Sequence, residues 1–303
     1  MNICVYHGID LDGFCGGAIY AKAMEEHGVP YELIPMNYGW ELPWKKFQNA
    51  EIVIIDFSMQ TFEDWDRLAR MARSIVWIDH HKSAIEDWSL IGTFPSDWCG
   101  FIAYTNTKKA GCELAWEYFF RKVPMPRAVS LLGRYDVWDH SDPDVLPFQY
   151  GMRNLDLRPD IGRDLILWDQ FLKCYDSSLV TETIFNGKLI LNYQKREDEI
   201  GAKAGCFTLE WEGLTWICAN RGGRGSQFFD SVWNSEKFDG MMGFSWNGEC
   251  WTFGLYSDKD GVDCGSIAKK YGGGGHRGAA GFQRLDLPFD LDLTQKLFSE
   301  SPK

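Results

Sequence analysis

Short apolar runs rich in β-branched residues alternate with segments of helical spacing over residues 2–78, and this alternation constrains the fold more than any other feature. We predict strands over residues 2–6, 31–36, 51–55 and 74–78, and helices over residues 14–27 and 61–73. Strands that alternate with helices form parallel sheets with helices on both faces. The N-terminal part of the chain is therefore predicted to be an α/β domain.

The character of the chain changes after this region. We predict helical structure over residues 105–131, broken near Pro124 and Pro126, and over residues 164–203. Strands are then predicted over residues 207–211, 214–219, 241–246 and 249–256. The Asn247-Gly248 step is typical of a two-residue hairpin turn. The predicted organisation is an α/β domain over residues 1–180, a connecting helix over residues 181–204 and a smaller C-terminal α/β domain over residues 205–303.

Composition narrows the classes of partner. The 303 residues carry a formal net charge of −12, which disfavours binding of a long DNA duplex through its phosphates. The apolar runs are too short to span a bilayer, and we see no signal peptide. The nine Cys have no paired spacing, so we interpret Cys4, Cys112 and Cys218 as reduced core residues of a cytoplasmic protein.

Polar side chains follow three of the predicted strands. They are His7, Asp10 and Asp12 after the first strand, Asp56 after the third, and Asp79, His80 and His81 after the fourth. Because ligands bind outside the carboxyl ends of parallel strands, we expect these residues to share one crevice. If the chain at Asp10 and Asp12 is extended, both side chains point the same way.

Carboxylates crowded in this manner repel one another unless protons or cations neutralise them. Imidazole and carboxylate ligands suit Mn²⁺, Fe²⁺, Co²⁺ or Zn²⁺. Two such cations, bridged by one carboxylate, can clamp a phosphoryl group and ionise a water molecule. The alternative is that the acids are helix N-caps, as Asp12 would be before a helix at Phe14, and that the histidines have no joint role.

A glycine-rich segment near the C-terminus is the second chemical signal. It runs from Gly272 to Gly281 and contains His276 and Arg277. Glycines let backbone N–H groups approach an anion closely, and Arg suits bidentate contact with a phosphate. The alternative is a flexible linker, although an apolar Phe282 follows directly. We therefore expect this segment to bind an anion.

Together these motifs resemble the DHH phosphoesterase family with its DHH-associated C-terminal domain, including oligoribonuclease-type and cyclic-nucleotide phosphodiesterase members. The resemblance extends from residue 2 to about residue 282. The matching motifs are His7 to Gly13, Asp56-x-Ser58, Asp79-His80-His81-Lys82, Gly133-Arg134-Tyr135-Asp136 and Gly273 to Gly281.

The resemblance implies a site with two divalent cations, of which Mn²⁺ is the usual one. The implied ligands are His7, Asp10 and Asp56 for one cation, and Asp12, Asp56, His80 and Asp136 for the other. Asp139 is an alternative to Asp136. Asp79 would orient an imidazole, while His81 would act on the scissile phosphate. The implied substrate-binding residues are Lys82, Gly273, Gly274, Gly275, His276 and Arg277.

These features predict a metal-dependent phosphodiesterase, an exonuclease of the oligoribonuclease type, that acts on short oligonucleotides or on linear or cyclic dinucleotides and mononucleotides. The alternatives are a hydrolase of phosphomonoesters, pyrophosphate or polyphosphate, and a nucleotide-sequestering protein without catalysis. No long duplex and no membrane is expected as a partner, and the oligomeric state stays open.

Overall fold

The computed structural model describes residues 1–90, 98, 100–173, 178–290, 292 and 294–297. The chain divides into two compact units, Met1–Leu191 and Asn192–Lys303. Among the described residues, none of the helices combines the length and apolar character that crossing a bilayer requires.

The N-terminal unit is built on a five-stranded sheet in which every neighbouring pair is parallel, with the order β2-β1-β3-β4-β5. The strands are β1 (Asn2–His7), β2 (Tyr31–Met36), β3 (Glu51–Ile55), β4 (Ser74–Asp79) and β5 (Phe101–Thr105). The first four confirm the predicted strands, and the predicted α/β class is confirmed with them.

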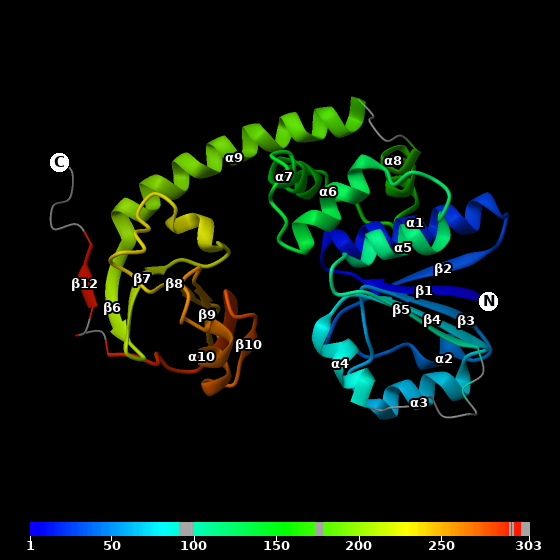
Figure 1. Cartoon of the computed structure of the whole chain (residues 1–303), viewed down its shortest axis with the longest axis horizontal. Helices are drawn as coiled ribbons and strands as arrows, with labels where there is room; N and C mark the ends of the chain where they lie inside the picture. Colours follow the sequence, from blue (N-terminus) through cyan, green and yellow to red (C-terminus); the bar gives the residue numbers. More distant parts are fainter. Residues whose placement is uncertain (91–97, 99, 174–177, 291, 293, 298–303) are drawn as a thin grey trace. The chain divides into compact units, whose positions relative to one another are not determined.

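Helices cover both faces of this sheet (Figure 1). On one face lie α1 (Leu11–Glu26) and α5 (Gly111–Phe119), with α6 (Arg127–Asp136), α7 (Val145–Leu155) and α8 (Gly162–Lys173) packed outside them. The other face is covered by α2 (Trp44–Phe47), α3 (Phe62–Met71) and α4 (Lys82–Leu90).

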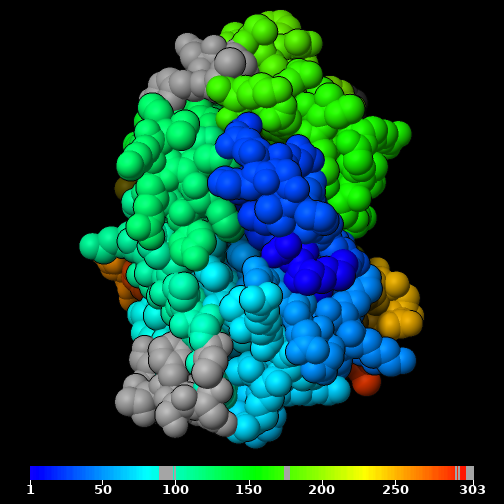
Figure 2. Space-filling view, turned by 90° about the vertical axis from the view of Figure 1, so that its right-hand side faces the viewer, coloured from blue at the N-terminus to red at the C-terminus, as the bar shows by residue number. Residues whose placement is uncertain are grey.

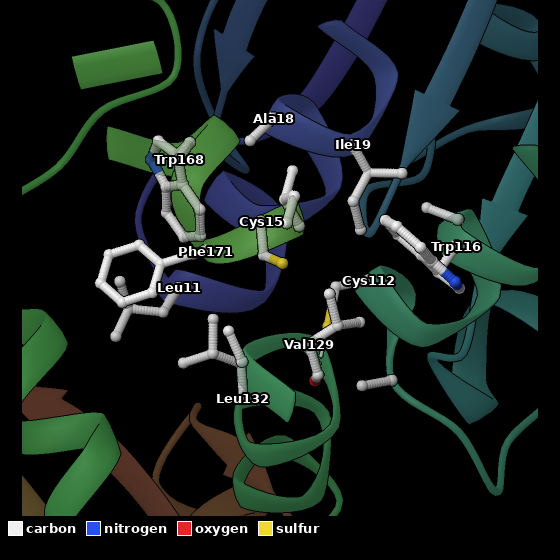
Figure 3. Packing of buried hydrophobic residues seen from close by; sticks show 14 of the residues in the cluster. Leu11, Cys15, Ala18, Ile19, Cys112, Trp116, Val129, Leu132, Trp168 and Phe171 are labelled. Carbon is white, nitrogen blue, oxygen red and sulfur yellow. Dashed lines mark hydrogen bonds between the residues drawn. The ribbon is translucent and has the colours of Figure 1, made fainter. Parts of the chain in front are cut away.

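The core on the α1 side joins α1 to α5, α6, α7 and α8, and Figure 3 shows part of it. Cys15 and Ile19 of α1 are fully buried among residues of α5, α6 and α8, including Cys112 and Trp168. Figure 2 shows that the end of α1, in blue, reaches the surface of this unit between segments coloured green. Cys4, Cys112 and Cys218 are buried, as predicted for core residues, and none of the three is in a disulfide in the part of the chain that the structure describes.

The helix predicted over residues 105–131 is wrong in its first part. Residues 101–105 form the edge strand β5, whose β-branched and aromatic side chains favour a strand. Helical structure resumes in α5 and, after the prolines, in α6. The helical region over residues 164–203 is α8 followed by α9 (Ser178–Gly205), and residues 174–177 between them lie outside the described residues.

The C-terminal unit contains a seven-stranded sheet in the order β10-β11-β9-β8-β7-β6-β12. Its strands are β6 (Cys206–Trp211), β7 (Leu214–Asn220), β8 (Gly240–Trp246), β9 (Trp251–Tyr256), β10 (Gly274–Gly275), β11 (Ala279–Arg284) and β12 (Thr294–Lys296). The short helix η1 (Ser226–Phe229) follows β7, and α10 (Cys264–Lys270) packs on β11 and β9. This is the predicted smaller unit of mixed strands and helix.

Candidate metal centre

Three neighbouring strands deliver polar side chains to the same edge of the parallel sheet. His7 is the last residue of β1, Asp56 follows β3, and Asp79 is the last residue of β4. Since β1, β3 and β4 are adjacent and parallel, their carboxyl ends meet at this edge. The expected convergence of the three sequence clusters is present in the N-terminal unit.

The turn after β1 differs from the expectation of an extended chain at Asp10 and Asp12. Asp10 is the N-cap of α1, where its Oδ1 accepts a hydrogen bond from the N–H of Gly13 at 2.9 Å. Asp12 therefore lies in the first turn of the helix, and the alternative reading of Asp12 as the N-cap is also wrong. Gly13 is required here, because a Cβ would lie 2.0 Å from the carbonyl oxygen of His7.

Asp56 lies at the centre of the cluster. It is 2% exposed and has a φ of 55°, a left-handed conformation that Asp tolerates and that turns the chain sharply after β3. Its Oδ2 lies 3.6 Å from Nδ1 of His7, and its Oδ1 lies 3.1 Å from Nε2 of His80. The two oxygens of one carboxylate thus face different imidazoles.

A single nitrogen of His80 meets three carboxylates. Its Nε2 lies 3.1 Å from Asp56, 3.2 Å from Asp136 and 3.7 Å from Asp12. Asp136 is the last residue of α6, so a fourth segment of chain contributes to the cluster. One imidazole N–H cannot donate to three carboxylates at once. The surplus of acceptors around this nitrogen is the arrangement that a cation would satisfy.

The carboxylate of Asp12 is held by the start of α5. Its Oδ2 accepts from the N–H of Gly111 at 2.7 Å, and its Oδ1 accepts from the N–H of Cys112 at 2.8 Å. A Cβ on Gly111 would lie 2.7 Å from Cβ of Asp56 and 3.1 Å from Oδ2 of Asp12. No sequence motif predicts this positioning element, because backbone amides at a helix start carry no side-chain signal.

Asp79 orients the second histidine of its motif. Its Oδ1 lies 2.8 Å from Nδ1 of His81 and accepts the backbone N–H of His80 at 2.7 Å. Its Oδ2 accepts from the indole N–H of Trp77 at 3.2 Å. Asp79 is fully buried, so the orientation of the His81 ring is fixed from within the unit.

The charges of the cluster are strongly interdependent. Burial lowers the pKa of His80, but Asp56, Asp12 and Asp136 outweigh it and raise the pKa to about 10. Asp10 and Asp56 raise the pKa of His7 to about 10 in the same way, against the effect of burial. Burial, followed by the charge of Asp12, raises the pKa of Asp136 to about 7. The cluster therefore takes up protons wherever no other cation neutralises it.

Three groups in this cluster have the residue types and spacing of metal sites, with candidate ligand atoms within 4.8 Å of one another in each. They are His7, Asp10 and Asp56; Asp12, His80 and Asp136; and Asp56, Asp79, His80 and His81. Nδ1 of His7 is buried 2.6 Å from Asp10, but the contact lacks hydrogen-bond geometry, and no other described residue accepts from this atom. An imidazole nitrogen buried in this way fits the role of a metal ligand.

Other residues singled out in the sequence do not join the cluster. Lys82 begins α4 with an exposed side chain that lies 3.6 Å from Glu86. Asp139 is bound by Arg134 at 2.8 Å and by Ser141, so Asp136, not Asp139, lies beside His80.

The glycine segment belongs to the C-terminal unit, where much of it serves local structure. The N–H groups of Gly272, Gly273 and His276 donate to carbonyl oxygens of the same unit, and Gly274 and Gly275 pair with β11. Arg277 donates to Asp260 at 3.2 Å and to the carbonyl of Lys259 at 3.0 Å. His276 and Arg277 are both exposed.

Comparisons with known proteins address the fold. No protein-family model matches the chain. An uncharacterised protein of Acanthamoeba polyphaga mimivirus is 26% identical over 338 aligned positions, which cover 100% of this chain and 74% of that protein. An exopolyphosphatase-related protein from Bacteroides fragilis has a similar structure, with a TM-score of 0.56 and 13% identity over 96% of this chain and 88% of that chain.

A pGpG-specific phosphodiesterase, PggH from Vibrio cholerae, aligns with a TM-score of 0.49 and 12% identity over 94% of each chain. The likeness to the Bacteroides fragilis structure shows the fold, and this fold agrees with the chain's resemblance to the DHH phosphoesterases.

Proposed function

We propose that the chain is a two-metal phosphodiesterase that hydrolyses short oligonucleotides or linear or cyclic dinucleotides and mononucleotides. The observation that carries this proposal is the position of Asp56. It is buried, and its two oxygens face His7 on one side and His80 on the other. A carboxylate in this arrangement would suit a ligand shared by two divalent cations.

The proposed ligands are His7, Asp10 and Asp56 for one cation, and Asp12, Asp56, His80 and Asp136 for the other. Imidazole and carboxylate donors suit Mn²⁺, which we propose as the resident ion. When bound, such cations polarise a phosphoryl group and lower the pKa of a water molecule. The amides of Gly111 and Cys112 fix the Asp12 carboxylate, so α5 would hold one side of the site rigid.

His81 is the proposed catalytic histidine, and Asp79 is its positioning residue. Because Asp79 engages Nδ1 of the His81 ring at 2.8 Å, Nε2 is the nitrogen left to act on a phosphoryl oxygen. The His81 side chain is 36% exposed, compared with 12% for His80. This difference supports a role for His81 toward substrate and for His80 toward metal.

The proposed substrate is short because the chain is acidic. A formal net charge of −12 gives little attraction for a long phosphate backbone. We propose that residues 1–180 carry the metal site and that residues 205–303 assist in substrate binding. Residues 181–204 are the proposed helix that connects these two domains. The proposed substrate-binding residues are Lys82, Gly273, Gly274, Gly275, His276 and Arg277.

The test is turnover by the full chain with Mn²⁺ of a panel of labelled dinucleotides to pentanucleotides, cyclic dinucleotides and mononucleotides, pyrophosphate and polyphosphate. The proposal expects hydrolysis of nucleotidic phosphodiesters. Phosphate release from pyrophosphate or polyphosphate alone would favour the second hydrolase class. Tight nucleotide binding without turnover, with fewer than one metal per chain, would indicate sequestration.

A further inference from the structure

A cavity of about 310 Å³ opens beside His81 within the N-terminal unit. His81 lines this cavity and is also a member of the metal-capable group with Asp56, Asp79 and His80. The remaining walls come from Tyr38, from the segment at the start of α3 and from α4. The cavity therefore adjoins the candidate metal centre at His81.

Aromatic rings contribute to the apolar part of the cavity wall, and neighbouring rings hold them in place. Tyr38 stacks on Phe57 at a ring distance of 5.0 Å and an interplanar angle of 24°. Trp88 packs against Trp65 at 5.1 Å. Phe62, which also lines the cavity, is 42% exposed. Rings of this kind provide surfaces on which a nucleobase can stack.

The polar part of the lining carries no positive charge apart from what His81 can supply. The described residues that line the cavity include Ser58, Ser83 and Asp87, but neither Lys nor Arg. Asp87 makes no hydrogen bond or ion pair with another described residue, so its carboxylate is available to accept from hydroxyl or amino groups. A chain of further phosphates would meet a carboxylate here and no fixed cation, which disfavours it.

We propose that this cavity binds one nucleoside next to the scissile phosphate, with its base among the aromatic rings and its ribose or amino groups toward Asp87. The inference rests on the proposed function and adds to it that the group beside the reacting phosphate is an aromatic base, not a second phosphate. The volume matches the lower end of small-molecule sites, which suits a single nucleoside.

The test compares a dinucleotide with an analogue in which hydrogen replaces each base in turn. Wild-type protein with Mn²⁺ should prefer the intact dinucleotide over one of these analogues by about ten- to a hundredfold in kcat/KM, the range expected for base stacking. Ser83→Trp places an indole in the cavity and should abolish this preference. The preference is the ratio of two kcat/KM values measured on the same variant. Damage to the metal centre lowers both values and therefore cancels in the ratio.

Matched variants distinguish the effect of filling the cavity from the effect of changing an exposed side chain. Glu63→Trp introduces the same side chain at an exposed position of α3 that does not line the cavity, and it should keep the preference. Phe62→Ala removes an exposed ring without filling space, and it should reduce the preference by about fivefold or more. Phe62→Ala also serves if Ser83→Trp fails to fold.

A binding measurement distinguishes failure of the cavity assignment from failure of the proposed function. Isothermal titration should show adenosine or guanosine 5′-monophosphate binding at least about tenfold more tightly than ribose 5-phosphate. Turnover without base preference, or a preference retained in Ser83→Trp, would overturn the cavity assignment and leave the proposed function. Base-dependent binding that Ser83→Trp abolishes, without any turnover, would overturn the proposed function and keep the cavity. Neither turnover nor binding would overturn both.

Discussion

The strand-end cluster of the N-terminal unit and the glycine segment of the C-terminal unit attract notice in the sequence for the same reason, since each concentrates polar groups and histidine. In the structure they differ in how those groups are satisfied. Nε2 of His80 has three carboxylates within 3.7 Å. In the glycine segment, the N–H groups of Gly272, Gly273 and His276 already have carbonyl partners.

The strand-end cluster needs a bound ligand to satisfy its polar groups, and the backbone of the glycine segment does not. The buried cluster has more acceptors than protons to share among them, and a cation resolves the imbalance. The glycine segment completes its own backbone pairing and offers only exposed side chains. We therefore expect substitutions in the cluster to change metal binding and activity together, and substitutions in the glycine segment to change substrate affinity alone.

The largest effect is expected for Asp56→Ala. Loss of the proposed bridge should remove both cations and lower kcat/KM by at least about a thousandfold, which is about 4 kcal/mol of transition-state stabilisation. Metal analysis of the purified variant and its turnover of a dinucleotide measure the two effects. Full activity in Asp56→Ala would contradict the assignment.

The two carboxylates around the end of α6 should behave differently. Asp136→Asn removes a proposed ligand and should lower kcat/KM by about a hundredfold, about 2.7 kcal/mol. Asp139→Asn changes a side chain that is already paired with Arg134 and Ser141, so activity and metal content should stay close to those of the wild type. Equal losses in the two variants would argue against Asp136 as the ligand.

A smaller effect is expected where the backbone positions a ligand. Gly111→Ala forces a Cβ against Asp56 and Asp12, and should weaken Mn²⁺ binding by about tenfold in a titration, as loss of support around a metal ligand does. Gly162→Ala is the matched control, because Gly162 is likewise the first residue of a helix but its added Cβ meets open space. Unchanged Mn²⁺ affinity in Gly111→Ala would remove α5 from the account of the site.

The glycine segment should respond more weakly still. Arg277→Ala should raise KM for a dinucleotide by about fivefold, about 1 kcal/mol, with metal content unchanged. Arg284→Ala, which removes another acid-paired Arg of the same unit, is the control and should leave KM unchanged. A loss of bound metal in Arg277→Ala would contradict the expectation that the glycine segment affects substrate affinity alone.

The smallest effect concerns acid stability. Hydrogen bonds from Ser141 and contact with Arg134 lower the pKa of Asp139 from 3.8 to about 2. A lowered carboxyl pKa stabilises the folded chain at pH values above the unfolded pKa, and this contribution is lost as the pH falls through about 2. The difference in Tm between wild type and Asp139→Asn should therefore narrow from pH 6 to pH 3. A constant difference would show that the pairing makes no ionic contribution.

Much of the N-terminal fold could be predicted because the strands are continuous apolar runs. Residues 31–36 and 51–55 form strands with the predicted bounds. The edge strand β5 was missed because Thr105 was assigned to a helix that begins only at Gly111. The first helix begins three residues earlier than predicted, since Asp10 is its N-cap and Asp12 lies within its first turn.

For the candidate site, the sequence identified which acids and histidines meet, because each follows a strand of one parallel sheet. It could not identify the amides of Gly111 and Cys112, which act through the backbone. Nor could it choose between Asp136 and Asp139, because the end of α6 decides which carboxylate reaches His80.

The most direct test of a shared pair of cations is Mn²⁺ titration of the full chain followed by electron paramagnetic resonance. Ions about 3.5–4 Å apart and bridged by the Asp56 carboxylate should be magnetically coupled. We expect two Mn²⁺ bound per chain, with a coupled spectrum that disappears in Asp56→Ala. Binding of one ion or none, or of two ions with the spectrum of isolated Mn²⁺, would contradict it.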